Sequence, residues 1–208
     1  QALIEFQLGM IKMEVDDFEE KDRGSYSFGE MIRMFEEKST KPKWEQTHSS
    51  IQWIFPTNQR SGFAGQTSPI LPRKDTFISE HGQEIFDAVG NKIETSVDAY
   101  LYYLRNNGFL ELTNDHNFLR ITRVADSLQY FNKHDKAIEF LDTVLSEAIN
   151  ANSKSKRYWG RKLEEVKKDK QFSELQDAPS GYKSFYDQHR RLPPQPEPEP
   201  HLEGESED

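Results

Sequence analysis

The sequence predicts an all-α fold, a compact helical domain of about six to eight helices, on the basis of three observations. Apolar residues recur every three or four positions over most of the chain, as they do on one stripe of a helix. Side chains able to cap helices stand before several of these runs. Strand-like alternation is limited to short stretches, Ile4–Leu8 and Phe109–Leu112, and no internal repeat is found.

Residues 1–24 are predicted to be an N-terminal docking segment. Apolar residues are too frequent there for a free tail, so they could cover a surface of a partner. These apolar residues are Leu3, Ile4, Phe6, Leu8, Met10, Ile11, Met13, Val15 and Phe18.

Two helices are predicted in the next part of the chain. The first covers residues 28–38 and can be capped by Ser27. Its apolar stripe consists of Met31, Ile32 and Phe35. The second is short: Thr47 or Ser49 can cap it, and Pro56 ends it because a proline disfavours helical geometry in the preceding residue.

The centre of the chain holds the most regular helical patterns. Asp75 can open a helix, although Gly82 weakens its middle. Helices over 91–107 and 133–150 follow, and Gly108 stands where a helix C-cap belongs. The apolar stripes are Phe77, Ile78, Ile85 and Phe86, then Ile93, Val97, Tyr100, Leu101, Tyr103 and Leu104, and finally Ile138, Leu141, Val144, Leu145 and Ala148.

A helix predicted from Asp115 to Phe131 carries apolar residues on two sides. Thr113, Asn114 or Asp115 can cap it. At about 100° per residue, one broad face holds Phe118, Ile121, Val124, Ala125, Leu128 and Phe131, and the other side holds Leu119, Arg123 and Tyr130. We therefore expect a central helix that is covered on both faces, with Arg123 partly buried beside a partner group.

The end of the chain divides into a basic helical extension, 153–192, and a disordered acidic tail, 193–208. Within 154–170, Lys and Arg are frequent, and the apolar stripe is Tyr158, Trp159, Leu163 and Val166. Such a helix either docks through its stripe with its polar side in water, which we favour, or binds anionic lipid or RNA. The tail alternates Pro and Glu, which predicts disorder. It could stay solvated, dock on a basic partner surface or pair with the basic extension.

The composition excludes several classes of protein. Because the chain has no cysteine, it has no disulfide scaffold, thiolate metal site or cysteine nucleophile. The net charge of −9 argues against a broad surface for nucleic acid, so no direct nucleic acid binding is expected. No apolar stretch approaches the roughly 18 residues that span a bilayer. We expect no transmembrane segment, while peripheral membrane association stays open.

Two short segments stand out, THSSIQWIFP at 47–56 and NDHNFLRITR at 114–123. They resemble the conserved region of the opioid growth factor receptor family, with its His-Ser-Tyr-Ile-Gln-Trp-Leu-Phe-Pro and Asn-His-Asn-x-Leu-Arg-Ile-Thr-Arg runs. The matching positions are His48, Ser49, Ile51, Gln52, Trp53, Phe55 and Pro56, then His116, Asn117, Leu119, Arg120, Ile121, Thr122 and Arg123. Ser50 replaces the tyrosine, the residues between the motifs align less well, and the long repeat-bearing tail of the vertebrate receptors is absent. The resemblance covers about 28–151.

The resemblance implies an opioid growth factor receptor-like helical domain, which we place at 25–152. It also implies an enkephalin-type peptide ligand, negative regulation of growth, and nuclear-envelope or membrane association without enzymatic activity. It assigns no residue to a peptide site. The conserved region also occurs outside animals, where an opioid peptide is not the expected ligand, so the fold transfers better than the function.

A candidate ligand or partner pocket is predicted where the two motifs could meet. Paired guanidinium groups suit a carboxylate or a phosphate, and an indole ring could stack on one of them. The candidate residues are His48, Gln52, Trp53, His116, Asn117, Arg120 and Arg123. The alternative, which we favour, is an internal network in which Arg123 pairs with Asp126 or a tyrosine hydroxyl and Gln52 satisfies a helix end.

The sequence predicts no metal, cofactor or catalytic residue. His48 and His116 lack HxxxH or HxxE spacing, and Asp115 and Asp126 are the only acids near them in the motifs. We expect each histidine to satisfy backbone groups at a helix start. The chain also lacks GxSxG, HExxH, a phosphate-binding glycine loop and a dinucleotide fingerprint.

The predicted function is therefore that of a non-enzymatic, receptor-like binding protein with a protein or peptide partner. The alternative is a structural or accessory subunit of a larger multiprotein assembly, with the other subunits as partners. An intracellular location is expected, nuclear or perinuclear by the resemblance, or organellar if the start at Gln1 reflects processing.

Overall fold

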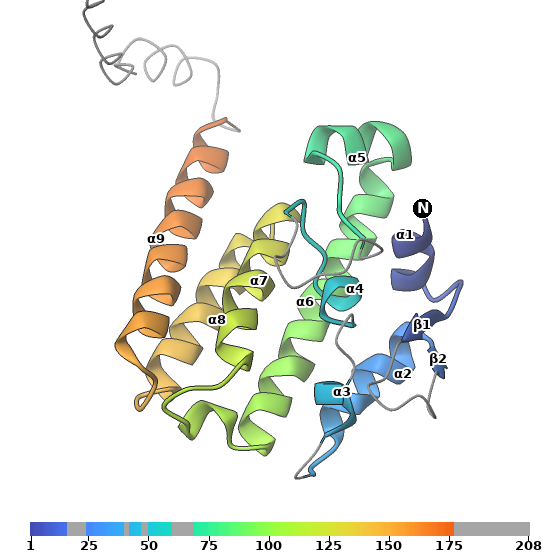
Figure 1. Cartoon of the computed structure of the whole chain (residues 1–208). Helices are drawn as coiled ribbons and strands as arrows, with labels where there is room; N and C mark the ends of the chain where they lie inside the picture. Colours follow the sequence, from blue (N-terminus) through green and yellow to red (C-terminus); the bar gives the residue numbers. More distant parts are fainter. Residues whose placement is uncertain (16–23, 40–41, 47–49, 60–68, 177–208) are drawn as a thin grey trace, which may run out of the picture. The chain divides into compact units, whose positions relative to one another are not determined.

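The computed structural model describes residues 1–15, 24–39, 42–46, 50–59 and 69–176. Helices predominate among them, beside one two-stranded antiparallel ribbon, which confirms the all-α class (Figure 1). The elements are α1 (Ala2–Gln7), β1 (Met13–Val15), β2 (Gly24–Tyr26), α2 (Phe28–Arg33), the 3₁₀ helix η1 (Met34–Glu36), α3 (Lys43–Gln46), α4 (Ser50–Ile54), α5 (Lys74–His81), α6 (Gln83–Asn106), the 3₁₀ helix η2 (Phe109–Glu111), α7 (Asn117–Tyr130), α8 (His134–Glu147) and α9 (Ser153–Gln176).

The chain divides into two units, Gln1–Lys170 and Gln171–Asp208. The described part of the second unit is the end of α9, up to Gln176. The predicted acidic tail, residues 177–192 of the predicted extension, and the motif residues Thr47, His48 and Ser49 lie outside the described residues.

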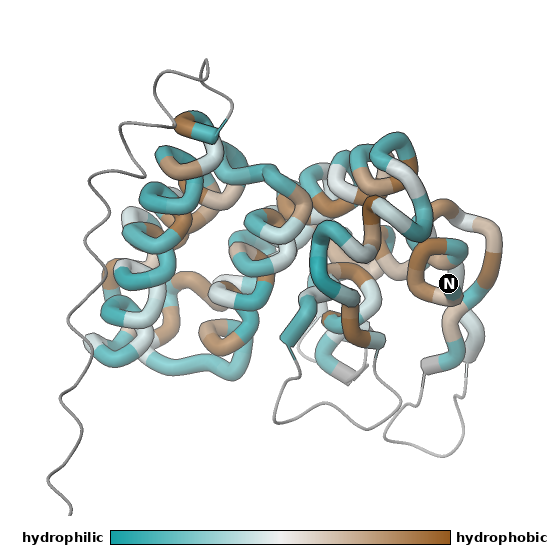
Figure 2. Tube along the Cα trace, turned by 90° about the horizontal axis from the view of Figure 1, so that it is seen from above, coloured by the Kyte–Doolittle hydropathy of each residue, from teal (hydrophilic) through white to brown (hydrophobic). Residues whose placement is uncertain are grey.

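Helix α6 is central in the first unit, with the N-terminal elements on one side and the α7–α8 pair on the other (Figure 1). Its buried apolar residues are Phe86, Val89, Ile93, Val97, Tyr100, Tyr103 and Leu104, which include most of the predicted stripe. Burying a large apolar side chain contributes roughly 1.5–3 kcal/mol, so this stripe stabilises the whole unit. Figure 2 shows hydrophobic and hydrophilic residues alternating along the helices, as expected for helices that bury one side.

Gly82 separates two helices where the sequence predicted a single weakened one. Its φ of +90° cannot continue a helix and is readily adopted only by glycine. The Gly82 N–H closes α5 by donating to the Ile78 carbonyl at 2.8 Å, and the Gly82 carbonyl accepts from the Phe86 N–H at 3.2 Å to open α6. The helix that Asp75 was expected to open therefore ends at His81.

Part of the N-terminal apolar set belongs to the core of this chain, whereas Met10 is exposed and Phe18 lies outside the described residues. Leu3, Ile4 and Phe6 are buried, and α1 packs against α4 and α6. The Phe6 ring contacts Phe28 and Trp53 edge to face, with centroids 5.9 and 5.4 Å apart. Leu3, Ile4 and Phe6 are therefore not available as a docking face for a partner, which corrects the expectation for these three residues, while residues 16–23 of the segment lie outside the described residues.

The two short runs that allowed strands are both helical. Ile4–Leu8 falls at α1 and Phe109–Leu112 at η2, because a short apolar run fits either period and packing decides between them. The ribbon lies elsewhere, with Met13 opposite Tyr26. The Ser27 cap is confirmed: Ser27 Oγ accepts from the Glu30 N–H at 3.2 Å, and the Glu30 carboxylate accepts from the Ser27 N–H at 2.7 Å.

Helix α9 is docked through the predicted stripe. Trp159 is fully buried, its indole N–H donates to the Phe118 carbonyl at 3.2 Å, and its ring meets the Phe118 ring edge to face. Leu163 and Val166 are buried as well, whereas Tyr158 faces solvent. Up to Lys170, α9 therefore belongs to the same compact unit as the predicted domain 25–152.

Candidate functional site

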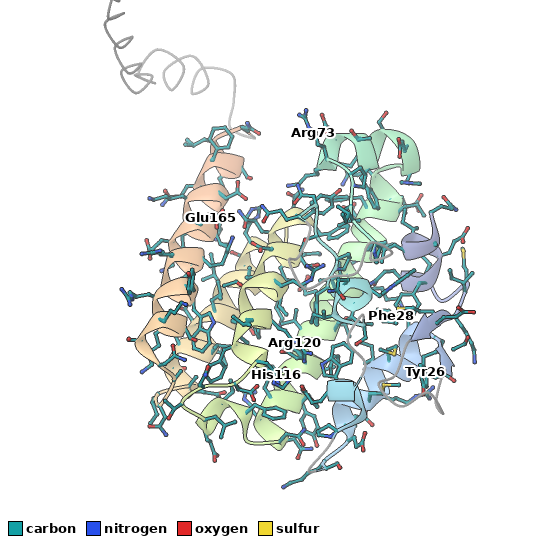
Figure 3. All side chains as sticks on the ribbon, in the orientation of Figure 1. Tyr26, Phe28, Arg73, His116, Arg120 and Glu165 are labelled. Atoms are coloured by element: carbon teal, nitrogen blue, oxygen red, sulfur yellow. The ribbon has the colours of Figure 1, made fainter. Side chains whose placement is uncertain are left out.

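The second sequence motif forms the first turns of α7, and Asp115 caps them. Asp115 Oδ1 accepts hydrogen bonds from the backbone N–H and from the side-chain amide of Asn117, both at 2.8 Å. An aspartate at this position satisfies helix N–H groups that have no partner within the helix. The cap fixes the start of the helix, where Figure 3 shows His116 and Arg120 close together.

Glu45 of α3 is the centre of a polar cluster that joins α3, α6 and α7. Its Oε1 accepts from the Tyr103 hydroxyl and from Asn117 Nδ2, the latter at 3.1 Å. Its Oε2 contacts His116 Nε2, and Arg120 lies 3.4 Å from both carboxylate oxygens. The Glu45 cluster consists of Glu45, Tyr100, Tyr103, Asp115, His116, Asn117 and Arg120.

Asn117 connects the Glu45 carboxylate to the Tyr100 hydroxyl within the cluster. The Asn117 side chain is fully buried, and its Oδ1 accepts from the Tyr100 hydroxyl at 2.9 Å and from Arg120 at 3.0 Å. Its amide donates to Glu45 and Asp115. All the hydrogen-bonding capacity of this buried amide is thus used, which removes the cost of burying it.

The contacts set the protonation states of the cluster. Burial raises the pKa of Glu45, but the hydrogen bond from His116, the charge of Arg120, and the bonds from Tyr103 and Asn117 outweigh it and lower the pKa to about 2. The hydrogen bond to Glu45 outweighs burial and raises the pKa of His116. Burial raises the pKa of Tyr100 and, together with the bond to Glu45, that of Tyr103. At neutral pH, Glu45 is ionised and both tyrosines are protonated.

This arrangement is suited to holding helices together. A carboxylate with a pKa of about 2 accepts protons poorly near neutral pH, because efficient general bases have pKa values close to the working pH. The Glu45 side chain is 14% exposed, and that of His116 is 55% exposed. The carboxylate is therefore nearly enclosed, and only the histidine side of the cluster is open to solvent.

Arg123 of the second sequence motif forms a hydrogen bond with Phe55 of the first. Its Nε donates to the Phe55 carbonyl at 3.1 Å, next to the end of α4. Burial lowers the pKa of Arg123, which Asp126 partly offsets. The sequence predicted a bond to Asp126 or a tyrosine hydroxyl, but Asp126 instead pairs with Lys162 at 2.5 Å. The guanidinium prefers the carbonyl because the end of a helix leaves carbonyls without partners inside it.

The first motif places its candidate residues away from the Glu45 cluster. Trp53 packs edge to face on Phe6, and the Trp53 carbonyl accepts from the Gln7 side chain. Gln52 is buried, and its Oε1 has no hydrogen-bond partner among the described residues, so the predicted bond to a helix end is not seen for this atom. His48 lies outside the described residues. The structure thus brings together His116, Asn117 and Arg120 of the predicted set.

Sequence reasoning missed Glu45 and the roles of the two tyrosines. Tyr100 and Tyr103 were assigned only to the apolar face of their helix, and a tyrosine on such a face can also present a hydroxyl. Glu45 stands in a segment without helical periodicity, so nothing in the sequence pointed to it. Among the described residues, no group of three or more His, Cys, Asp or Glu side chains is arranged to hold a metal ion.

One side of α7 faces solvent at its start. We call His116, Leu119, Arg120 and Arg123 the α7 edge, since these positions are three or four residues apart and share one side of the helix. Leu119 is 68% exposed, while both arginines are partly buried. The expectation that α7 is covered on both faces holds at Tyr130, which is buried, and is wrong at Leu119. On this side of α7, the position of Leu119 is therefore open to solvent, whereas that of Tyr130 is covered.

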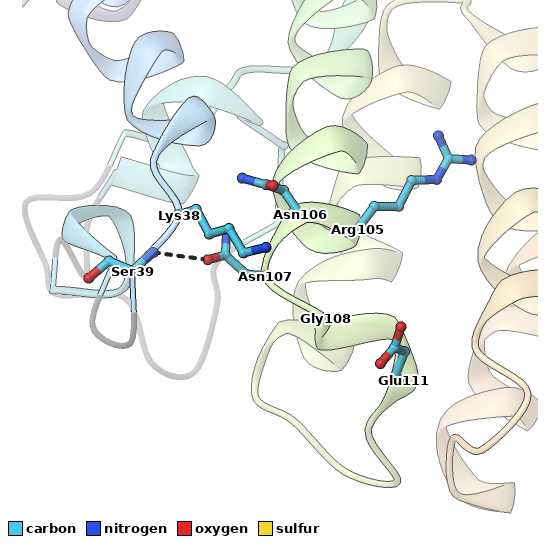
Figure 4. Close-up of a pocket in the computed structure, with 7 residues that line it drawn as sticks. All are labelled: Lys38, Ser39, Arg105, Asn106, Asn107, Gly108 and Glu111. Carbon is cyan, nitrogen blue, oxygen red and sulfur yellow. Dashed lines mark hydrogen bonds between the residues drawn. The ribbon is translucent and has the colours of Figure 1, made fainter.

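Two of the cavities in the described part of the chain are lined mainly by polar residues, and both lie apart from the Glu45 cluster. One of about 620 Å³ lies beside the end of α6, where the Ser39 N–H donates to Asn107 Oδ1 at 3.4 Å (Figure 4). It is lined by Lys38, Ser39, Arg105, Asn106, Asn107, Gly108 and Glu111. The other, of about 250 Å³, is polar and lies between α5, α7 and α9. Neither is lined by a residue of the predicted pocket.

The fold and the cluster define an all-helical domain in which a polar network joins α3 to α6 and α7. Comparison with protein-family models, with curated proteins and with solved structures found no match for this chain. The resemblance to the opioid growth factor receptor family therefore stays a prediction from the two motifs. In the described part of the chain, no helix is long and apolar enough to cross a membrane.

Proposed function

We propose that this chain is a non-enzymatic binding protein with an opioid growth factor receptor-like domain, and that the α7 edge receives a protein or peptide partner. The observation that carries the proposal is the exposure of Leu119 among cationic side chains. Leu119 is 68% exposed, with Arg120 and Arg123 beside it and His116 one turn earlier. An apolar side chain of a partner could pack on Leu119 while a carboxylate of the same partner pairs with a guanidinium group.

The Glu45 cluster supports this proposal by fixing the shape of the edge. Arg120 and His116 are both held by the Glu45 carboxylate, and Arg123 is held by the Phe55 carbonyl. Side chains that are already fixed lose little conformational freedom when a partner binds, which favours affinity. Among the described residues, Arg123 uses one of its five N–H donors, so the others can meet a ligand.

The resemblance supports a peptide ligand, although it assigns no residue of this chain to a peptide site. All four residues of the α7 edge are positions that match the second family motif, and the family implies a peptide ligand and no catalysis. The further properties that it implies, which are peripheral membrane association and a nuclear or perinuclear location, rest on the resemblance alone.

The test is a selection of peptides followed by affinity measurements. A displayed random peptide library is panned on the purified chain, and the enriched peptides are titrated by calorimetry into wild type, Leu119→Lys and Ile149→Lys. Ile149 is the matched control, because it is exposed to the same 68% as Leu119 but lies outside α7. We expect binding at least about tenfold weaker in Leu119→Lys, equivalent to about 1.4 kcal/mol, and unchanged in Ile149→Lys.

Two outcomes would contradict the proposal. The first is that no peptide is enriched, or that Ile149→Lys weakens binding as much as Leu119→Lys does. The second is that mass spectrometry finds the bound peptide cleaved or modified, which would indicate an enzyme.

The apolar N-terminal segment bears on the accessory-subunit alternative, because its apolar residues could dock on another subunit. Leu3, Ile4 and Phe6 are buried within this chain, so they do not supply a docking face. Co-purification of the native chain with other subunits in fixed ratio would still favour this alternative over a free binding protein.

A further inference from the structure

Helix α9 turns one side to solvent, and that side is basic. We call Lys154, Arg157, Tyr158, Arg161 and Lys168 the basic face of α9. All five residues are exposed, and at about 100° per residue they project together, away from the side that carries Trp159, Leu163 and Val166. The buried residues hold the helix in place, so the basic face is presented on a fixed support.

The four cations of this face form no ion pair among the described residues, whereas three other cations of α9 do and Lys156 donates to the Ile149 carbonyl. Lys162 pairs with Asp126 and Glu165, Lys167 with Glu164 at 3.7 Å, and Lys170 with Asp135 at 2.7 Å. No such pair is formed within the described part of the chain by Lys154, Arg157, Arg161 or Lys168. In a chain of net charge −9, the four cations of this face form a local positive surface in which none of them is paired with an acid of the described residues.

An exposed aromatic ring lies among these charges. Tyr158 is 53% exposed and lies next to Arg157 and three residues before Arg161. Tyrosine and arginine are enriched in protein interfaces, because a rigid ring gives a large contact area at a small cost in side-chain entropy. Arg157 and Arg161 are one turn apart, a rise of about 6 Å, which matches carboxylates four residues apart on a partner helix.

The acids on the same side indicate which class of partner fits. Glu164 and Glu165 lie between Arg161 and Lys168, and both are exposed (Glu165 in Figure 3). The continuous phosphates of RNA or of an anionic membrane would meet these carboxylates and be repelled. A protein segment can instead place acids opposite Arg157 and Arg161, and a neutral or basic residue opposite the two glutamates.

We propose that the basic face of α9 binds an acidic amphipathic segment of a partner protein. Carboxylates of that segment pair with Lys154, Arg157 and Arg161, and an apolar side chain packs on Tyr158. This surface lies on a different helix from the α7 edge, so the inference goes beyond the function proposed above and does not depend on it.

The first experiment measures the charge contribution. The probe is a fluorescein-labelled synthetic helical peptide with Glu at every fourth position and interspersed Leu, and its binding is followed by fluorescence anisotropy at low salt. We expect the double variant Arg157→Glu with Arg161→Glu to bind at least about tenfold more weakly than wild type. Added salt should weaken wild-type binding, because exposed charges are screened. The control is Arg33→Glu with Lys38→Glu, which changes the net charge equally at exposed positions elsewhere and should leave the affinity within about twofold of wild type.

The second experiment measures the contribution of the aromatic ring. Tyr158→Ala should weaken peptide binding about fivefold or more, whereas Tyr102→Ala should not, although Tyr102 is exposed to nearly the same extent, 52%. Circular dichroism and thermal unfolding confirm that each variant is folded. Leu119→Lys should leave the affinity for the acidic peptide unchanged, which separates this surface from the α7 edge.

Three results would overturn the inference. The peptide could fail to bind wild type, or the two charge variants could weaken binding equally. Single-stranded RNA, or vesicles of phosphatidylserine and phosphatidylcholine, could instead bind wild type more tightly than the peptide and lose that affinity in the Arg157→Glu, Arg161→Glu variant. That last outcome would assign the face to nucleic acid or membrane.

Discussion

Glu45 shows how a single charge is kept inside a helical domain. Its hydration is replaced by a hydroxyl, an amide, an imidazole and a guanidinium from two other helices. Burial alone would favour the neutral acid, and the lowered pKa means that these four groups more than compensate for it. The cluster is therefore held together by the negative charge of Glu45, and that charge is in turn the counter-charge of Arg120 and His116.

Glu45→Gln tests this dependence at nearly constant volume. The amide keeps the size of the side chain but leaves Arg120 and His116 without a counter-charge, so we expect the free energy of unfolding to fall by about 2–3 kcal/mol. The measurement is urea unfolding near neutral pH. Glu36→Gln is the control, because Glu36 is exposed, and it should change stability by less than about 0.5 kcal/mol. Equal effects of the two substitutions would refute the assigned role of Glu45.

The same cluster predicts how stability depends on pH. The pKa of Glu45 is about 2 in the folded chain against 4.5 ordinarily, so its contribution is complete above about pH 4.5 and is lost as the pH falls toward 2. The loss is on the order of 3 kcal/mol. The raised pKa of His116 has the opposite effect on stability. The stabilisation that His116 contributes is complete below pH 6.5 and is lost as the pH rises through the raised pKa. Unfolding measured from pH 2 to 8 should show both slopes in wild type and much weaker ones in Glu45→Gln.

The sequence predicted three of the seven members of this cluster as site residues, for a physical reason. His116, Asn117 and Arg120 stand together in one motif at the start of a regular helix, so they could be recognised as neighbours. Glu45 lies in a four-residue helix, α3, and reaches the cluster only through tertiary packing. No local pattern encodes such a contact, and Trp53, expected beside an arginine, packs on Phe6 for the same reason.

Among the elements, the break at Gly82 is the clearest case of one residue setting an arrangement. Two helices meet there because φ is +90°, which a residue with a Cβ adopts only with strain. Space is not the constraint, since a Cβ at Gly82 would have no atom within 4 Å.

Gly82→Ala should therefore lower stability by about 1 kcal/mol through backbone strain alone. Gly29→Ala is the control: its surroundings are equally open, but Gly29 lies inside α2 without a positive φ, so alanine should be neutral or stabilise by up to about 1 kcal/mol. Thermal unfolding of both variants gives the comparison. A stabilised Gly82→Ala would mean that the junction can adopt continuous helical geometry.

The helices were predicted well where their stripes are long and poorly where their segments are short. The regular spacing over 91–107 and 133–150 corresponds to α6 and α8, and the Asp115 cap and the Gly108 turn lie where expected. The runs Ile4–Leu8 and Phe109–Leu112 hold too few residues to distinguish a period of two from one of 3.6. Tertiary contacts decide between the two periods, and both runs are helical.

At the scale of the whole molecule, α9 up to Lys170 is a structural part of the domain and not an appendage. Trp159 is fully buried against α7 and donates to a backbone carbonyl there. Removing α9 would expose the face of α7 that carries Phe118, whereas removing an independent extension would leave that face covered as before.

Trp159→Ala should lower the free energy of global unfolding by about 3–5 kcal/mol, because it leaves a large cavity in the core. Tyr158→Ala, at the adjacent exposed position, should change it by less than about 1 kcal/mol. Urea unfolding should show a single transition in both variants. A separate early transition of the α9 signal in Trp159→Ala, with the main transition unmoved, would show that α9 is a separate unit.

The distance along the chain between the members of the Glu45 cluster has a kinetic consequence. Glu45 is separated from Tyr103, His116, Asn117 and Arg120 by 58, 71, 72 and 75 residues, whereas α7 and α8 are neighbours in sequence as well as in space. Closing long loops costs more entropy than pairing adjacent helices, and it slows folding. We expect the α6–α9 region to assemble first and α3 to dock onto it afterwards. The ionised Glu45 would then become fixed only in this late step of folding.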